Sequence, residues 1–164
     1  MAASVVFAAL VFVATYVFVI SIPSTSGYFN LGETIIYITA LIFGATTGAL
    51  AGGIGAMVAD IMLGYAHFAP ATLVIKGVEG AIVGTLNKRL RGRFNKSLSS
   101  AIAVVVGGLE MVLGYFVYEQ LVLGYPFALA LAEIPFNLMQ MSVGLIIAIP
   151  VVAAIQRAFP QLKS

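Results

Sequence analysis

Long apolar runs separated by short polar segments make up most of the chain. The runs are unbroken and show none of the period-two alternation that is typical of strands in a membrane β-barrel. The pattern therefore predicts α-helices that cross a lipid bilayer, because a helix satisfies its own backbone polar groups. The predicted fold class is an all-α membrane protein with six transmembrane helices. The predicted spans cover residues 4–22, 32–45, 48–64, 72–86, 98–118 and 135–157.

Two parts of this assignment depend on turn residues. Pro23 ends the first apolar run, and the Ser-, Gly- and Asn-containing segment 23–32 predicts a loop. The stretch from Glu33 to Gly64 is too long for one span and short for two. Small residues around Gly48 predict a tight turn in its middle, which gives two short helices. The alternative is a single span there and five spans in all.

Composition supports the membrane class. Of the 164 residues, 62% are hydrophobic and 9% are charged, whereas a soluble domain has about 45–50% apolar and about 25% charged residues. These values exclude a soluble globular domain, a disordered chain and a nucleic-acid-binding protein, and the lack of cysteine excludes a disulfide scaffold. We expect one multi-pass domain in the cell membrane. No basic residue precedes the first run, so we expect a retained span rather than a signal peptide.

The basic residues predict which side of the membrane each loop faces. Arg157 and Lys163 lie at the end of the chain, and the positive-inside rule makes them cytoplasmic. The same rule applies to a loop two spans earlier, which holds Lys88, Arg89, Arg91, Arg93 and Lys96. Six spans then place both termini in the cytoplasm. The outer loops would be 23–32, 65–71 and 119–134, the last being a loop or a short interfacial helix.

Polar side chains within the spans gather in the outer half of the predicted bundle. An ionisable group at the centre of a span costs roughly 2.5–3.5 kcal/mol, so this shared depth is informative. The inner half is apolar and rich in small residues, which leaves no polar pathway across the membrane. The pattern predicts a cup that binds a small solute from outside. The candidate binding residues are Asn30, Glu33, Tyr37, Asp60, Tyr65, His67, Lys76, Glu79, Glu110, Tyr115, Asn137 and Gln140.

Most of these candidates also have a purely structural interpretation. Lys76 and Glu79 are three residues apart on a helix and can pair with each other. Comparable structural roles are capping or snorkelling for Glu33 and Asp60, interhelical hydrogen bonds for Asn137 and Gln140, a surface position for His67 and an interfacial belt for Tyr115.

Catalytic and energy-coupling motifs are absent from the sequence. There is no GxxxxGK[ST], HExxH or GxSxG, and a single His with no Cys does not support a zinc site. We therefore predict no enzyme activity, no catalytic residues, no metal and no cofactor. An active transporter of this kind would take its energy from a partner or an ion gradient. Small residues recur every four positions from Gly44 to Asp60, which favours close helix packing.

Three segments together resemble a known family. They are Phe29–Glu33 (FNLGE), Gly52–Asp60 (GGIGAMVAD, followed by Gly64 and Tyr65) and Ala71–Gly80 (ATLVIKGVEG). They resemble the substrate-binding S components of energy-coupling factor (ECF) vitamin transporters. The subgroup includes riboflavin, hydroxymethylpyrimidine and pyridoxine carriers. The resemblance is strongest over residues 29–85 and continues elsewhere in length and six-helix layout.

The resemblance implies a function and partners. An S component captures a vitamin outside the cell and works with a transmembrane T component and two ATPases. It is thought to topple in the bilayer when docked, and the first outer loop, here 23–32, acts as its lid. Family members often carry an Ala-xxx-Ala pair in the first span for docking, and this chain has Ser4 and Ala8 instead.

The chemistry of the candidate residues is compatible with a small heterocycle. Lys76 can donate to a ring oxygen, a hydroxyl or a phosphate, and carboxylates such as Glu79 can accept from ring or amine donors. Tyr37, Tyr65 and Tyr115 can stack on a planar ring. We expect a pyrimidine or pyridine vitamin precursor, with riboflavin next. The competing hypotheses are a self-sufficient ion-coupled carrier, an intramembrane enzyme and a structural membrane subunit.

Overall fold

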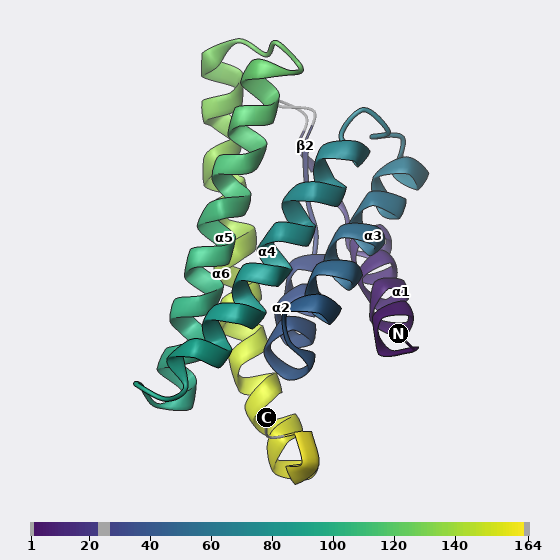
Figure 1. Ribbon diagram of the computed structural model, residues 1–164. Helices are drawn as coiled ribbons and strands as arrows, with labels where there is room; N and C mark the ends of the chain where they lie inside the picture. Colours follow the sequence, from purple (N-terminus) through teal and green to yellow (C-terminus); the bar gives the residue numbers. More distant parts are fainter. Residues whose placement is uncertain (1, 23–26, 163–164) are drawn as a thin grey trace.

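A computed structural model describes residues 2–22 and 27–162 of the chain. Six α-helices form one bundle, and a two-stranded hairpin follows the first helix in the chain and precedes the second (Figure 1). The elements are α1 (Ala2–Val17), β1 (Ile20–Ile22), β2 (Gly27–Phe29), α2 (Gly32–Phe43), α3 (Ala45–Leu63), α4 (Ala69–Leu90), α5 (Lys96–Leu121), α6 (Phe127–Ala158) and the 3-10 helix η1 (Pro160–Leu162).

The helical class and the six helices agree with the sequence prediction. Four helices, α3 to α6, are long and apolar enough to cross a membrane, whereas α1 and α2 are shorter. The tight turn predicted between the second and third helices is present, because α2 ends and α3 begins at Gly44. Its φ of +84° lies in the left-handed region, which glycine adopts without steric cost.

Residues 20–22 differ from the predicted first span. The helix ends at Val17 rather than at residue 22, and Ile20–Ile22 pairs with Gly27–Phe29 as an antiparallel hairpin. Ile20 lies opposite Phe29, and Ile22 lies opposite Gly27. An apolar run with β-branched residues is compatible with either a strand or a helix, so periodicity alone did not find this hairpin. Residues 23–26 of the predicted loop 23–32 lie outside the described residues.

The sixth helix begins earlier than the sequence predicted. Residues 119–134 were expected to form a loop or a short interfacial helix, but α5 continues to Leu121 and α6 begins at Phe127. Pro135, the predicted start, lies inside α6. A proline within a membrane helix is tolerated where neighbouring groups satisfy the backbone, so it need not mark a helix end.

Helices of opposite direction alternate through the bundle. The α3–α4 and α5–α6 loops lie at one end, and the α4–α5 loop with its basic residues lies at the other end, near the C-terminus (Figure 1). Asn95 caps the start of α5, since its side chain accepts a 2.9 Å hydrogen bond from the Leu98 amide. The hairpin and the start of α2 lie at the same end as the α3–α4 loop, opposite the basic loop (Figure 1).

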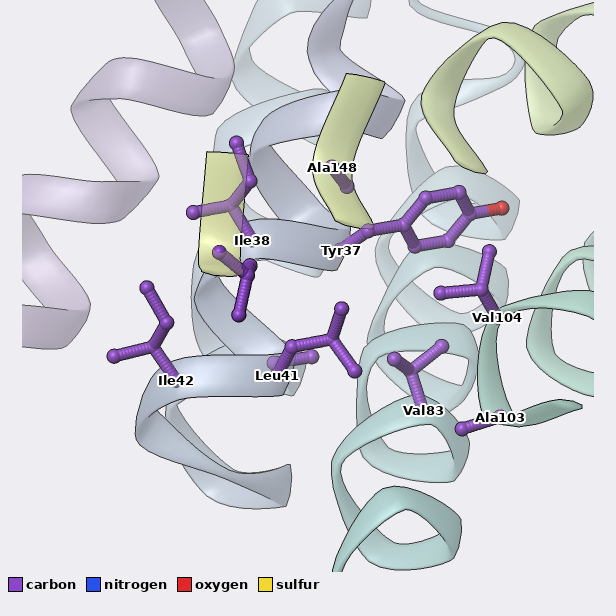
Figure 2. Close-up of a cluster of buried hydrophobic side chains, with 10 residues drawn as sticks. Tyr37, Ile38, Leu41, Ile42, Val83, Ala103, Val104 and Ala148 are labelled. Atoms are coloured by element: carbon purple, nitrogen blue, oxygen red, sulfur yellow. The ribbon is translucent and has the colours of Figure 1, made fainter. Parts of the chain in front are cut away.

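An apolar core fills the half of the bundle nearer the basic loop. Tyr37, Leu41, Val83, Val104 and Ala148 come from α2, α4, α5 and α6 and are buried together. Figure 2 shows these side chains meeting between the helices. The core separates the opposite end of the bundle from the basic loop.

Glycines bring α3 and α4 into backbone contact. A Cβ placed on Gly80 would lie 2.9 Å from the backbone nitrogen of Ala49, and one on Gly52 would lie 2.8 Å from the carbonyl oxygen of Lys76. A real Cβ essentially never approaches backbone this closely, so both positions require glycine. Gly77, on the same helix, has only one neighbour within 4 Å, the Ala49 carbonyl oxygen at 3.6 Å.

The difference in space around Gly80 and Gly77 gives a matched pair of substitutions. We expect Gly80→Ala to destabilise the protein by about 1–3 kcal/mol, because the new methyl group overpacks against α3. Gly77→Ala has room for its methyl group and gains helix propensity, so its stability should stay level or rise by up to about 1 kcal/mol. Thermal unfolding in detergent, followed by circular dichroism, measures both. Equal melting temperatures for the two variants would contradict the close α3–α4 contact.

Candidate functional site

A cavity lies at the end of the bundle that holds the hairpin. The space open to the centres of water-sized molecules is about 60 Å³. Every α-helix and the hairpin contribute to its wall, so the cavity is a product of the whole fold. Its lining residues are Thr15, Gly27, Tyr28, Asn30, Gly32, Glu33, Ile36, Ala56, Asp60, Tyr65, Phe68, Thr72, Lys76, Tyr115, Glu119, Glu133, Asn137 and Gln140.

Three buried charged groups form the base of this site. The Lys76 ammonium forms an ion pair with Glu33 across the α2–α4 interface, and its Nζ lies 3.3 Å from Glu79 Oε2. The exposed fractions of Glu33, Lys76 and Glu79 are 1%, 4% and 0%. Below them, the Tyr37 hydroxyl donates a 2.9 Å hydrogen bond to Glu79 Oε1. One lysine thus compensates two carboxylates, which leaves the cluster rich in hydrogen-bond acceptors.

The amide of Gln140 connects this cluster to the segment that follows the hairpin. Gln140 Nε2 donates to Glu33 Oε2 at 3.0 Å. Its Oε1 accepts from the backbone nitrogen of Asn30 at 3.0 Å and from Asn30 Nδ2 at 3.1 Å. Asn30 Oδ1 in turn accepts from the Gly32 amide at the start of α2. The chain entering α2 is therefore fixed to α6 and to the buried ion pair.

A second set of contacts holds the hairpin over the cavity. The Tyr28 hydroxyl of β2 donates a hydrogen bond to Asp60 Oδ1 on α3. Burial, and next the negative charge of Asp60, raise the pKa of the Tyr28 phenol well above its usual value, so it remains a donor. The Tyr28 ring also contacts Tyr65, with ring centroids 4.8 Å apart. In the same lining, the hydroxyls of Thr72 on α4 and Tyr115 on α5 lie 3.0 Å apart.

The structure brings most of the predicted binding residues into this one cavity. Tyr37 and Glu79 do not line the cavity and lie directly beneath it, since Glu79 contacts Lys76 and the Tyr37 hydroxyl donates to Glu79. His67 is exposed in the α3–α4 loop, and Glu110 lies on α5 and does not line the cavity. The predicted residues that line the cavity are Asn30, Glu33, Asp60, Tyr65, Lys76, Tyr115, Asn137 and Gln140.

Several lining residues were not among the sequence candidates. Tyr28 lies in the segment predicted as a loop, and a loop has no residue periodicity from which the direction of its side chains can be predicted. Glu133 falls in the predicted connection 119–134, whereas the structure places it on the first turns of α6. Glu119 falls in the same predicted connection, whereas the structure places it near the end of α5. The gathering of polar side chains in the outer half is the sequence signal that could have identified these two acids.

The predicted docking residues lie on α1. Ser4 and Ala8 are half-buried, and a Cβ on Gly55 of α3 would lie 2.5 Å from the Ala8 carbonyl oxygen. Ala8 therefore packs at least its backbone against α3. The exposed side of α1 carries larger apolar residues, including Val5, Leu10 and Val13.

Comparison with known proteins identifies the family. The family model of the ECF-type riboflavin transporter S component matches residues 1–157. The chain belongs to this family. It is therefore a membrane-embedded, multi-pass substrate-binding component of a transporter and not an enzyme.

Two relatives of this S component have curated names. A Pyrococcus woesei protein named "Uncharacterized protein in gap 3'region" is 43% identical over 103 residues. That match covers 63% of this chain and 66% of the relative, just under two thirds of its length. The thiamine precursor transporter HmpT of Lactococcus lactis subsp. cremoris (strain MG1363) is 28% identical over 144 residues, which cover 87% of this chain and 79% of HmpT.

The buried ion pair of this S component predicts a large stability effect. Lys76→Met leaves Glu33 and Glu79 without their cation, and breaking a buried pair from one side costs about 3–5 kcal/mol. Lys88→Met is the control, because Lys88 is exposed on the same helix and its loss should change stability by less than about 0.5 kcal/mol. Thermal unfolding in detergent compares the two. If both variants unfold at the wild-type temperature, the ion pair does not organise the site.

Proposed function

We propose that this S component binds a vitamin or vitamin precursor with a single heterocyclic ring. The size of the cavity supports this class. Its 60 Å³ corresponds to about four to six waters, at about 10–15 Å³ of such space each, and to roughly 120–180 Å³ of displaced liquid. That volume suits one six-membered ring with a few substituents. It is too small for the three fused rings and ribityl chain of riboflavin.

The hydrogen-bonding groups of the wall favour a ligand that donates. Glu33 Oε1 and Asp60 Oδ2 are buried acceptors without a hydrogen-bond partner among the described residues. A buried carboxylate oxygen without a partner costs about 1–3 kcal/mol or more, and a ligand N–H or O–H would remove this cost. Asn137 lines the same wall and offers one donor and one acceptor group. A ring with an exocyclic amine or hydroxyl fits these groups.

Lys76 acts mainly through its neighbours in this proposal. Its ammonium already contacts Glu33 and Glu79, so it fixes the carboxylate that faces the ligand. This position argues against the expectation that Lys76 receives a ligand phosphate. Aromatic side chains flank the space and provide surfaces for a planar ring: Tyr28, Tyr65, Phe68 and Tyr115.

The relatives support a pyrimidine ligand first. HmpT is named as a thiamine precursor transporter, and hydroxymethylpyrimidine is a single ring with an amine and a hydroxymethyl group. Pyridoxine has the same size class and is the second candidate. The family description names riboflavin, which the cavity volume does not favour.

We also propose that this component has six spans, with cytoplasmic termini, and binds its ligand from outside. The cavity lies at the end of the bundle opposite the basic loop, which the positive-inside rule places in the cytoplasm. Inward delivery would need a T component and two ATPases, with toppling of the loaded protein on docking through the Ser4–Ala8 side of α1. The apolar core beneath the cavity supports a carrier that moves as a body rather than an open pore.

A binding titration tests the ligand class. Calorimetry with hydroxymethylpyrimidine, pyridoxine and riboflavin should give sub-micromolar affinity for one of the single-ring compounds. Asn137→Ala should weaken that binding at least tenfold, about 1.4 kcal/mol, because a cavity amide is lost. Gln161→Ala is the control, since Gln161 is an exposed amide outside the cavity. Tight riboflavin binding with no single-ring binding would contradict the proposed class.

A transport measurement tests the partner requirement. Proteoliposomes that hold this protein alone should bind the ligand but accumulate none, with or without an ion gradient. Addition of the T component and ATPases with ATP should start uptake. Gradient-driven uptake by the protein alone would instead indicate an ion-coupled carrier.

A further inference from the structure

Two acidic residues in the outer wall of the cavity lie apart from the ion pair at its base. Glu119 lies near the end of α5 and Glu133 near the start of α6, and both line the cavity. Their exposed fractions are 3% and 5%. Such burial is rare for glutamate.

The two residues lie above the level of the Lys76 cluster. Gln140 contacts Glu33 and so marks the cluster on α6. Glu133 is seven residues earlier on that helix, about 10 Å further out at 1.5 Å per residue. Glu119 is one helical turn beyond Tyr115 on α5, about 6 Å further out. The cavity therefore has an inner level at Lys76 and an outer level at Glu119 and Glu133.

The outer level is acidic. Lys76 is the one Lys or Arg among the cavity-lining residues that the structure describes, and it is engaged at the inner level. Glu119 Oε2 is buried and has no hydrogen-bond partner in the described part of the chain. The Glu133 carboxylate lies against the hairpin, because a Cβ on Gly27 would be 2.7 Å from its Oε2. The open oxygen of Glu119, with the Glu133 carboxylate close enough to interact with it electrostatically, favours a positively charged occupant.

We propose that Glu119 and Glu133 bind a protonated amine substituent of the ligand. A primary ammonium carries three donors, which suit the open oxygen of Glu119 and a second carboxylate beside it. A metal ion is a poorer fit, since no group of three or more His, Cys, Asp or Glu in residues 2–22 and 27–162 is placed to hold one. The ring would occupy the inner level and its aminomethyl group the outer level. The same acids would reject a phosphate ester at that position.

This inference rests on the proposed single-ring ligand and names the substituent that the site prefers. Two pairs of compounds test it, because the members of each pair differ only in hydroxyl against ammonium. They are pyridoxine with pyridoxamine, and 4-amino-5-hydroxymethyl-2-methylpyrimidine with its 5-aminomethyl analogue. In calorimetry at neutral pH, the aminomethyl member of at least one pair should bind at least tenfold tighter.

Charge-removing variants locate the effect. Glu119→Gln and Glu133→Gln should each reduce the preference for the ammonium to threefold or less, while hydroxymethyl binding changes by less than threefold. Glu110→Gln is the matched control, because Glu110 lies on α5 but does not line the cavity, and it should keep the wild-type preference. If either variant unfolds, the preference of the wild-type protein within the two pairs still decides the question.

The outcomes separate this inference from the proposed function. Tight binding of a hydroxymethyl compound without preference for its amine would overturn the ammonium site and leave the single-ring function standing. A preference that survives in both folded variants would also overturn it. Absence of binding to all four compounds would overturn both proposals.

Discussion

The ion pair between Lys76 and Glu33 is the contact on which the site depends. Charged groups buried to this extent are stable only while their partners stay in place, so α2 and α4 cannot separate without a large cost. Glu79 and Tyr37 extend the contact downward into the core, and Gln140 extends it to α6. The polar residues of α2, α4 and α6 thus form one connected network of ion pairs and hydrogen bonds.

Close packing of small residues makes this arrangement possible. The glycines of α3 let α4 approach until backbone meets backbone, and Gly52 lies against the backbone of Lys76 itself. The half of the bundle nearer the basic loop gains its stability from the apolar core shown in Figure 2. The opposite half is then free to carry polar groups that a ligand can satisfy. The division of the bundle into an apolar half and a half with a polar cavity follows from this difference in packing.

The sequence predicted the parts of this structure that depend on periodicity and depth. Unbroken apolar runs indicated helices, and the shared depth of residues such as Glu33, Lys76 and Gln140 indicated a common site, which the cavity brings together. The hairpin could not be predicted, because Ile20–Ile22 continues an apolar run and its partner strand is set by tertiary contacts. Glu133 was missed because Pro135 was interpreted as a helix start. Which helix a polar group faces is decided by packing, which one sequence does not record.

Native mass spectrometry of the protein purified in mild detergent asks whether the cavity holds a vitamin. If it does, the protein should carry one small molecule at one-to-one stoichiometry, either as purified or after addition of single-ring vitamins and precursors. Asn137→Ala should lose this molecule at lower collision energy than the wild type. A folded protein that retains no compound from this panel would contradict a vitamin site, and it would favour the ion-coupled carrier or the structural subunit instead.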